Sequence, residues 1–516
     1  MQSDDSAPAS VLANTLAIRN RSWYWLILAF TLYGIARFPF VMHASGQMDE
    51  QWFAVPGLTM WKEGIPRIPY CPCRRRENFF ENADKCIMAL PPGLHFVQAP
   101  FFGVMRPGYP TARMPLFVGG FFFIATVWIF AGKVCSNATV GGIATCMVAV
   151  SRPILFTAVT ARPDLLCSLC GLVSMLFMWR WNDDPKWRYL TCAGLFCGLG
   201  ALFHPFAIVF CMQAGIWSLW RNGSYKQRIL RGVALTTATV VPMGLWLPYI
   251  VMFPYEFRSQ FFSNVLERSG PGVGSRLLWP WLSFKRHWVQ QWEFNESTQF
   301  LFLIGGMCIG TSIWLGRKNK VHSRYCLIAI SAVYFTATMP GLHPTKGYWL
   351  YPVALIYPIC VDAAYATLKW LFGDARSRSG KLLCGLGIAM VAIMIPGSGF
   401  RTSLTYLRHW GDDRYHAEHF IAKALEAMPQ EGIYMSDVSF VFDIYLTGRK
   451  TIIAQPRKRF WGDEEIHIDY LVIGREGNDD GWRDQYETQL LRRVGSTDSI
   501  FDCYVDICVP IKKSPE

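Results

Sequence analysis

The first apolar run of the chain reads Trp23-Tyr-Trp-Leu-Ile-Leu-Ala-Phe-Thr-Leu-Tyr-Gly-Ile-Ala36, and it is followed by the polar stretch His43-Ala-Ser-Gly-Gln-Met-Asp-Glu-Gln-Trp-Phe-Ala-Val-Pro-Gly57. A helix needs roughly 20 mostly apolar residues to cross the hydrocarbon core of a bilayer. The run reaches that length when it is extended to residue 42, so it predicts a membrane-spanning helix. Two adjacent carboxylates, Asp49 and Glu50, therefore lie where the chain leaves the membrane, and ionisable groups so close to it call for a chemical reason.

The composition is that of a membrane protein. Of 516 residues, 52% are hydrophobic and 17% are charged, and the mean hydropathy is +0.20. Average domains carry about 25% charged residues, so the apolar runs indicate one membrane domain with a polar appendage. Much of the net charge of +13 sits in short loops, which argues against a nucleic-acid-binding face and indicates membrane topology. Arg19 and Arg21 precede the first run and no small-residue cleavage site follows it, so we expect a retained span.

The apolar runs predict a polytopic all-α membrane protein with about eleven spanning helices. The runs lie at residues 23–42, 115–134, 140–159, 165–181, 189–203, 205–220, 232–253, 299–315, 325–339, 349–368 and 382–397. Lys and Arg concentrate in alternate short loops, which places the N-terminus in the cytoplasm by the positive-inside rule. We therefore expect a transmembrane domain at residues 1–397, with a first outer loop at 43–114, and a small extracytoplasmic α/β domain at 398–516.

The two long outer segments carry secondary-structure patterns of their own. In the first outer loop we expect helices near 50–62 and 92–105, lying along the membrane interface. In the C-terminal domain the sequence predicts a helix near 415–427 and strands at 432–436 and 470–474.

The cysteines give a conditional prediction. Most of them lie inside apolar runs, where cysteine behaves as a small buried hydrophobe. Cys71, Cys73 and Cys86 lie in the first outer loop, and Cys503 and Cys508 lie near the C-terminus. If these regions face an oxidising compartment, we expect one disulfide in each. No ligand quartet has the spacing of a zinc site.

Under this topology a small set of ionisable side chains gathers at the outer rim of the membrane. The set consists of Asp49, Glu50, Arg162, Asp164, His204, His343 and Lys346. A carboxylate can take a proton from an acceptor hydroxyl or amine, while cations hold a phosphate leaving group and stabilise its growing charge. A broad hydrophobic domain would hold a lipid tail, so the set predicts sugar transfer from a lipid-phosphate carrier.

Each member of the set also has a purely structural interpretation. The acidic pair suits the N-terminus of a helix. Arg162 and Asp164 suit an ion pair within a loop, His204 suits a helix end, and Lys346 suits an interfacial anchor beside aromatic residues. The functional interpretation is favoured, because all of these residues fall on one side of the membrane in a topology that was assigned without them.

The same segments resemble the GT-C superfamily of membrane glycosyltransferases, and most of all the branch with the protein O-mannosyltransferases and the aminoarabinose-lipid A transferase. The matching segments are Met48-Asp-Glu50, Leu90-Pro-Pro-Gly-Leu-His95, Ala161-Arg-Pro-Asp164, His343-Pro-Thr-Lys346 and Tyr348-Trp-Leu-Tyr-Pro352. The polar domain after the last span also fits, so the resemblance covers nearly the whole chain as architecture. Each of its motifs is short and weak by itself, and only the motifs in combination are specific for the superfamily.

This resemblance implies an inverting transfer from a sugar linked to a polyprenyl phosphate. It places the catalytic base on Asp49, with Glu50 as its neighbour or substitute. It places donor-phosphate binding on Arg162, His204, His343, Lys346 and Tyr348, with Asp164 and His95 in supporting roles.

Two features depart from the family. His204 stands where many relatives have Lys or Arg, which puts phosphate binding at this position in question, and the insert Cys71-Pro-Cys-Arg-Arg-Arg76 has no counterpart. We expect no cofactor and no resident metal, although Asp49, Glu50 and Asp164 leave a divalent cation open.

We therefore expect a hexosyl- or pentosyltransferase that acts at the outer face on a lipid, glycan or protein acceptor. The alternative is a polytopic transporter or flippase for a lipid-linked or anionic substrate. Transporters tend to show internal repeats and charges near the membrane midplane, whereas this sequence shows no clear repeat and places its charges at one rim. The expected location is a bacterial inner membrane, and an endoplasmic reticulum membrane would suit the same layout.

Overall fold

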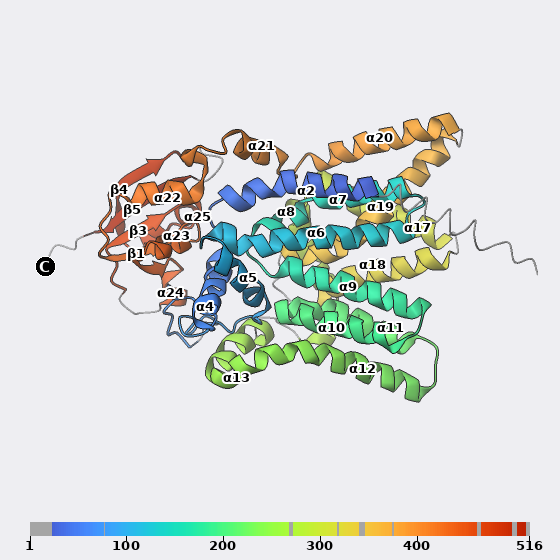
Figure 1. Ribbon diagram of the computed structural model, residues 1–516, viewed down its shortest axis with the longest axis horizontal. Helices are drawn as coiled ribbons and strands as arrows, with labels where there is room; N and C mark the ends of the chain where they lie inside the picture. The colour runs from blue at the N-terminus through green and yellow to red at the C-terminus, as the bar shows by residue number, and fades with distance from the viewer. Residues whose placement is uncertain are drawn as a thin grey trace, which may run out of the picture.

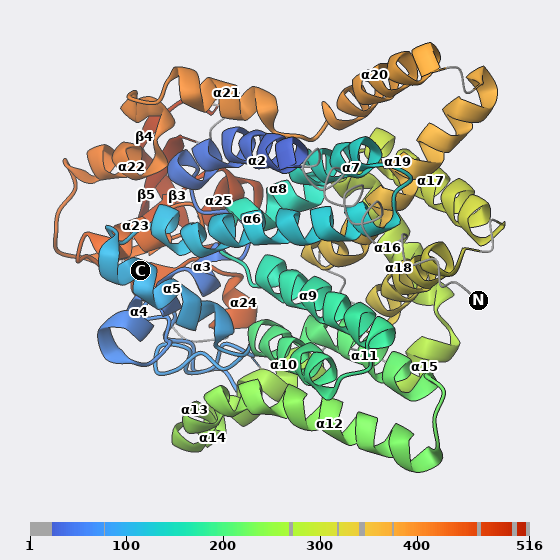
Figure 2. The ribbon, with the colours of Figure 1, turned by 45° about the vertical axis from the view of Figure 1, so that its right-hand side comes forward.

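The chain folds into a body of long helices that run side by side, with a small sheet-bearing domain at one end (Figure 1). The computed structural model describes residues 23–76, 78–267, 272–316, 319–339, 346–373, 376–461, 466–497 and 503–511. Turning the molecule by 45° shows the same two parts, with the sheet at the end where α2, α6 and α5 meet (Figure 2).

The helical body follows the chain order closely. Up to residue 252 it contains α2 (Trp23–His43), α3 (Glu50–Phe53), α4 (Val55–Glu63), α5 (Gly93–Val104), α6 (Tyr109–Val134), α7 (Ala138–Val150), α8 (Arg152–Val159), α9 (Asp164–Asp183), α10 (Trp187–Phe203), η1 (Pro205–Ala207), α11 (Ile208–Trp220), α12 (Tyr225–Met243), η2 (Gly244–Trp246) and α13 (Leu247–Met252). Beyond it come α14 (Pro254–Glu256), the π-helix η3 (Phe257–Glu267), α15 (Val273–Leu278), α16 (Trp281–Phe294), α17 (Ser297–Gly316), α18 (Lys320–Thr338), η4 (Lys346–Trp349), α19 (Leu350–Phe372) and α20 (Arg376–Met394).

Each predicted apolar run contains helix, but the predicted count of about eleven spans is not confirmed. Among the described residues, 6 helices are long and apolar enough to cross a membrane, and a seventh span results if α7 and α8, which are bent by 49°, are taken together. The apolar helices α10, η1 with α11, and Gly380–Met394 are shorter. The chain is nevertheless a multi-pass integral membrane protein, because several of its described helices are long and apolar enough to cross a membrane.

Close helix packing in the body depends on glycine. A Cβ atom at Gly120 of α6 would lie 2.0 Å from the Tyr33 hydroxyl oxygen of α2, and one at Gly142 of α7 would lie 2.1 Å from Trp25. Small residues let membrane helices approach in this way. The Tyr33 hydroxyl donates to the Phe117 carbonyl oxygen at 2.9 Å. This packing fixes the C-terminal end of α2, from which the polar loop with the acidic pair departs.

The C-terminal domain contains one mixed sheet. Its elements are α21 (Phe400–Arg408), η5 (Asp413–Tyr415), α22 (Ala417–Leu425), β1 (Ile433–Ser436), α23 (Val441–Leu446), β2 (Lys450–Ile453), α24 (Arg457–Phe460), β3 (Tyr470–Ile473), α25 (Arg475–Asp479), α26 (Trp482–Gln485), β4 (Thr488–Gly495) and β5 (Tyr504–Pro510). The strand order is β2-β1-β3-β5-β4, with β1 parallel to β2 and β3, and β5 antiparallel to β3 and β4. The predicted helix and the two predicted strands are confirmed as α22, β1 and β3, and the boundary drawn at residue 397 falls between α20 and α21.

The sheet domain packs on the polar loop that follows α2 (Figures 1 and 2). The Gly46 N–H donates to the Ser439 carbonyl oxygen at 3.0 Å, and the Tyr109 hydroxyl donates to the Val438 carbonyl oxygen at 2.6 Å. A Cβ atom at Gly46 would lie 2.1 Å from that Val438 oxygen, so the close approach requires glycine. The sheet domain thereby helps to fix the loop that carries the acidic pair.

The first outer loop is folded, and its two predicted helical regions are confirmed as α3 with α4 and as α5. The expected disulfides do not form. Cys71 and Cys86 are buried thiols, and Cys508 is a buried thiol in β5. Packing separates Cys71, which lies in the main core, from Cys86, which packs with Met88 and Trp246 in a separate cluster.

Candidate active site

Glu50 is the buried centre of the loop that follows α2. Its side chain and that of Arg113, near the start of α6, are both 0% exposed. Arg113 donates from Nε to Glu50 Oε1 at 2.8 Å and from Nη2 to Oε2 at 2.5 Å. The same carboxylate accepts from the Ala161 N–H at 2.6 Å and from the Gln47 N–H at 2.9 Å. Glu50 thus joins the loop to α6 and to the segment after α8, and its oxygens are already used by these four donors.

Asp49 points away from this buried network. Met48 has a left-handed backbone, with φ at 49°, and this turn separates the two neighbouring carboxylates. Asp49 occupies the N-cap position of α3 but makes no capping hydrogen bond, so the helix-cap interpretation does not account for it. Its side chain is 48% exposed and pairs with Nη1 of Arg162. Asp49 therefore offers a carboxylate that a substrate can reach.

Arg162 bridges two carboxylates at this point. While Nη1 faces Asp49, its Nε donates to Asp164 Oδ2 at 2.9 Å, and the arginine side chain is 6% exposed. The guanidinium also lies over the Phe156 ring, 5.7 Å from its centre. Asp164 begins α9 and is 1% exposed. The predicted loop ion pair is present, and it extends to Asp49, so the two acids fix the guanidinium from both sides.

The turn η4 brings Lys346 and Tyr348 to the same cluster. A Cβ atom at Gly347 would lie 2.5 Å from Asp164 Cγ, so glycine lets the turn pack directly on the start of α9. Lys346 Nζ lies 5.9 Å from the centre of the Phe294 ring, and it forms no ion pair with a described acid. Since this ammonium is only partly exposed and has no carboxylate partner in the described chain, it suits an anionic ligand.

His204 combines a structural role with a contact to the cluster. Its Nδ1 accepts from the Phe206 N–H at 3.0 Å, which is the helix-end interpretation. Its ring lies 5.2 Å from that of Tyr348, and Tyr348 in turn stacks on Phe206 at 4.9 Å. The structure therefore brings His204 beside Tyr348.

His95 has its own side-chain partner outside this cluster. His95 lies in α5, is 3% exposed, and its Nδ1 is 3.4 Å from Gln98 Oε1. Burial lowers the pKa of His95 to about 4, so the ring is neutral at pH 7. Among the described residues no hydrogen bond joins His95 to Asp49 or Arg162. His343 lies outside the described residues.

Arg113, the partner of Glu50, was not predicted from the sequence. A signal was present, because an arginine at the start of an apolar span needs a partner at that depth. Arg113 additionally donates to the Ala44 and Ser45 carbonyl oxygens at 2.7 and 2.5 Å. No short motif identifies a contact between residues so far apart in the chain.

The carboxylates do not form a ligand cluster for a metal ion in the part of the chain that the structure describes. Asp49 and Asp164 both face Arg162, and the Glu50 oxygens are used by Arg113 and two backbone N–H groups. The arrangement is a chain of acids and guanidinium groups with one reachable carboxylate and a nearby ammonium.

The overall architecture is similar to that of solved membrane proteins. ArnT from Cupriavidus metallidurans in the apo state gives a TM-score of 0.57 at 12% identity, covering 96% of this chain and 98% of ArnT. The same protein bound to undecaprenyl phosphate gives 0.53 at 12% identity, with 96% and 99% covered. The oligosaccharyltransferase AglB from Archaeoglobus fulgidus, in complex with an inhibitory peptide and a dolichol-phosphate, gives 0.56 at 12% identity, with 91% and 71% covered. This chain has the GT-C fold.

A sequence match agrees with the GT-C fold. Residues 90–246 match the family described as dolichyl-phosphate-mannose-protein mannosyltransferase. The matched range contains Arg113, Arg162, Asp164 and His204, and it begins after the acidic pair. A comparison with curated protein sequences found no match. The resemblance drawn from the short motifs is therefore confirmed, while the roles of individual residues stay predictions.

Proposed function

We propose that the protein transfers a sugar from a polyprenyl-phosphate donor to a hydroxyl or amine acceptor, with inversion at the anomeric carbon. The observation that carries this proposal is the reachable Asp49 carboxylate, held by Arg162 beside an ammonium that has no described acidic partner. The GT-C fold supports it, because the similar structures hold a dolichol-phosphate in AglB and undecaprenyl phosphate in one ArnT structure.

In this mechanism Asp49 is the general base. Its carboxylate accepts the proton of the acceptor as the acceptor oxygen or nitrogen attacks the anomeric carbon. The bond from that carbon to the phosphate oxygen breaks, and polyprenyl phosphate leaves with the electron pair. Attack from the face opposite the phosphate inverts the anomeric centre. Arg162 orients the carboxylate, and Asp164 holds Arg162 from its other side.

The leaving phosphate is held by the cations and donors around η4. Lys346 supplies a positive charge, and Tyr348 supplies a hydroxyl beside His204. Fixed donors placed where charge develops stabilise a transition state more than the ground state. Glu50 is a positioning residue in this scheme, because its carboxylate is enclosed by Arg113 and two backbone N–H groups.

We also propose the orientation and the location. Lys and Arg concentrate in alternate short loops, which supports a cytoplasmic N-terminus and an extracytoplasmic C-terminal domain. On this basis the transmembrane domain covers residues 1–397, the outer domain covers 398–516, and the bacterial inner membrane is the proposed site of action.

The donor is tested with the purified chain in detergent. A panel of polyprenyl-phosphate sugars is offered together with lipid, glycan and peptide acceptors, and release of free polyprenyl phosphate is followed. We expect one donor to be consumed and the product to have the opposite anomeric configuration by NMR. A retained configuration would contradict the proposed single displacement. Movement of an intact lipid-linked sugar across vesicles, without release, would favour the transporter alternative.

The phosphate site is tested by Lys346→Gln, with Lys62→Gln as the matched control, because Lys62 is an exposed lysine of the first outer loop. A charge-assisted hydrogen bond contributes about 1.5–3 kcal/mol, so we expect kcat/KM for the donor to fall about 10- to 100-fold in the Lys346 variant alone. Equal activity of the two variants would remove Lys346 from the donor site.

A further inference from the structure

The inner face of α16 carries polar side chains, whereas an amphipathic helix ordinarily turns its apolar face inward. His287, Gln291 and Asn295 follow one another at intervals of four residues, and their exposed fractions are 1%, 2% and 1%. Residues at this spacing share one face of a helix. On another face Trp288 and Trp292 are 50% and 39% exposed, as suits the membrane interface. α16 therefore directs two amides and a histidine into the protein.

These buried side chains are only partly hydrogen-bonded. His287 Nδ1 accepts from Trp349 Nε1 of η4 at 3.0 Å, and burial lowers the pKa of His287 to about 4, so its ring is neutral at pH 7. Asn295 Nδ2 donates to Gln291 Oε1 at 2.5 Å. Gln291 Nε2 and Asn295 Oδ1 have no hydrogen-bond partner among the described residues. Two amides that touch thus leave one buried donor and one buried acceptor open.

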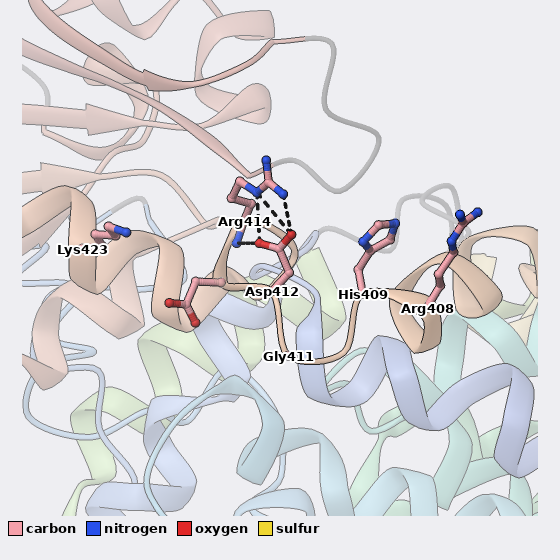
Figure 3. Close-up of a pocket in the computed structure, with 7 residues that line it drawn as sticks. Arg408, His409, Gly411, Asp412, Arg414 and Lys423 are labelled. Carbon is pink, nitrogen blue, oxygen red and sulfur yellow. Dashed lines mark hydrogen bonds and ion pairs between the residues drawn. The ribbon is translucent and has the colours of Figure 1, made fainter.

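Open polar atoms call for a ligand when they are buried, whereas polar groups at the surface do not. In the open depression at the end of α21, Arg414 Nη2 binds Asp412 Oδ2 at 2.7 Å, while Arg408 and Lys423 lie at opposite ends, where water solvates them (Figure 3). A buried polar atom lacks this access, so leaving it unpaired costs its hydration without compensation. The open amide atoms of α16 therefore indicate a polar ligand.

The open amides lie next to the proposed donor site. α16 packs against η4, which carries Lys346. Phe294 shares the helix face of Gln291, and its ring lies 5.9 Å from Lys346 Nζ. The same ring packs edge-on against Phe156 at 5.4 Å, and the Arg162 guanidinium lies over Phe156 at 5.7 Å. One aromatic pair thus connects the face that carries the amides with Arg162 and Lys346.

We propose that Gln291 and Asn295 bind hydroxyl groups of the donor sugar. This inference rests on the proposed function, in which Lys346 holds the phosphate that carries the sugar. Gln291 Nε2 would donate to a sugar hydroxyl oxygen, and Asn295 Oδ1 would accept from a sugar hydroxyl group. Sugar hydroxyl groups suit both atoms, because each of them can donate and accept.

The subsite favours an uncharged sugar. Its polar side chains are two amides and a neutral imidazole. Of the nearby acids, Glu293 is exposed, and Glu296 faces Arg152 with 3.8 Å between Oε1 and Nη1. A sugar ammonium group placed against the amides would lose its hydration without gaining a counter-charge. We therefore expect a neutral hexose or pentose rather than an amino sugar.

The test measures binding of two lipids to the full-length protein in detergent, by displacement of a fluorescent polyprenyl phosphate. One lipid is the tightest binder among polyprenyl-phosphate glucose, galactose and mannose, and the other is sugar-free polyprenyl phosphate. Gln291→Met keeps the length of the side chain and removes its amide. We expect it to weaken binding of the hexosyl lipid about 3- to 10-fold, which is the contribution of one neutral hydrogen bond, and to leave binding of the sugar-free lipid unchanged. Its unfolding midpoint without lipid should stay near that of the wild type, because the lost bond to Asn295 is offset by removal of the open amide nitrogen.

Gln213→Met is the matched control. Gln213 is a buried glutamine of α11 whose Nε2 donates to the Ile328 carbonyl oxygen at 2.9 Å and whose Oε1 accepts from the Tyr351 hydroxyl at 2.7 Å. Its replacement should lower the unfolding midpoint, because these partners lose their hydrogen bonds. It should not change the ratio of the two lipid affinities.

The preference for an uncharged sugar is tested with amino analogues of the hexosyl lipid, in which an ammonium group replaces the hydroxyl at carbon 2, 3, 4 or 6 in turn. We expect at least one analogue to bind the wild type about tenfold more weakly than the parent lipid, because its charge is placed against the amides. Equal binding of all four analogues would overturn the preference.

Two results would overturn the sugar subsite and leave the proposed function standing. Unchanged binding of the hexosyl lipid by Gln291→Met would show that water, and not a sugar, occupies the open amides. An equal loss of both lipids in this variant would show that Gln291 acts through the fold. A wild type that binds neither lipid would contradict the proposed function itself, and this inference with it.

Discussion

Glu50→Gln should destabilise the fold far more than its single-atom change suggests. The native carboxylate accepts from Arg113 twice, from Ala161 and from Gln47. A glutamine amide has one oxygen, so it can keep the donors on one side only, and its NH₂ group then faces the donors on the other. Arg113 is 0% exposed and would lose its counter-charge. Breaking a buried pair in this way costs about 3–5 kcal/mol.

The matched control is Glu63→Gln. Glu63 also forms a bidentate pair with an arginine, with Arg67 Nε at 2.5 Å and Nη2 at 2.6 Å, but it is 37% exposed. Exposed pairs contribute only about 0–1 kcal/mol. Thermal unfolding in detergent should therefore show a midpoint lowered by about 3–5 °C for Glu50→Gln, at about 1 °C per kcal/mol for a chain of this length, and by less than about 1 °C for Glu63→Gln. Equal midpoints for the two variants would refute the assignment of Glu50 as a positioning residue.

Three further predictions concern the surroundings of Asp49. Arg162→Lys keeps the charge but loses the planar fork that contacts two acids, so we expect kcat to fall about tenfold with a smaller change in KM; an unchanged kcat would separate Arg162 from the chemistry. Gly347→Ala places a methyl group 2.5 Å from Asp164 Cγ, so it should lower activity in a protein that still unfolds cooperatively, whereas normal activity would show that η4 can shift freely. The folded-state pKa of His95 is about 4, below its ordinary 6.5, so its contribution to stability is present above pH 6.5 and is lost as the pH falls. Between pH 7.5 and pH 5 the wild type should therefore lose about 2 kcal/mol more stability than His95→Gln, and parallel pH curves would contradict the buried neutral ring.

Much of the fold could be predicted because hydropathy reports burial in lipid directly. Each apolar run became helical, and the helix at 415–427 and the strands at 432–436 and 470–474 were found close to their predicted places. The number of spans was harder to predict from the sequence, because α10 and α11 are short, and because α7 and α8 form a bent pair. Length alone does not show how such helices cross a bilayer.

The contacts within the candidate site were predicted in part, for a physical reason. Asp49, Arg162 and Asp164 are in contact as the sequence suggested, because short loops at one end of neighbouring spans must meet. The different burial of Asp49 and Glu50 could not be predicted, because it depends on Arg113, which reaches Glu50 from another helix. The expected disulfides were not found either, because the spacing of cysteines in the sequence does not show how each thiol packs.

The claim that Asp49 is the catalytic base is tested most directly by Asp49→Asn, with Asp84→Asn as the control. Asp84 is another aspartate of the first outer loop that pairs with an arginine, Arg74, at 2.6 and 2.7 Å. With the donor identified from the panel, we expect Asp49→Asn to lower kcat about 10²- to 10⁴-fold at an unchanged unfolding midpoint, and Asp84→Asn to retain wild-type turnover. Wild-type turnover by a folded Asp49→Asn protein would contradict the proposed mechanism.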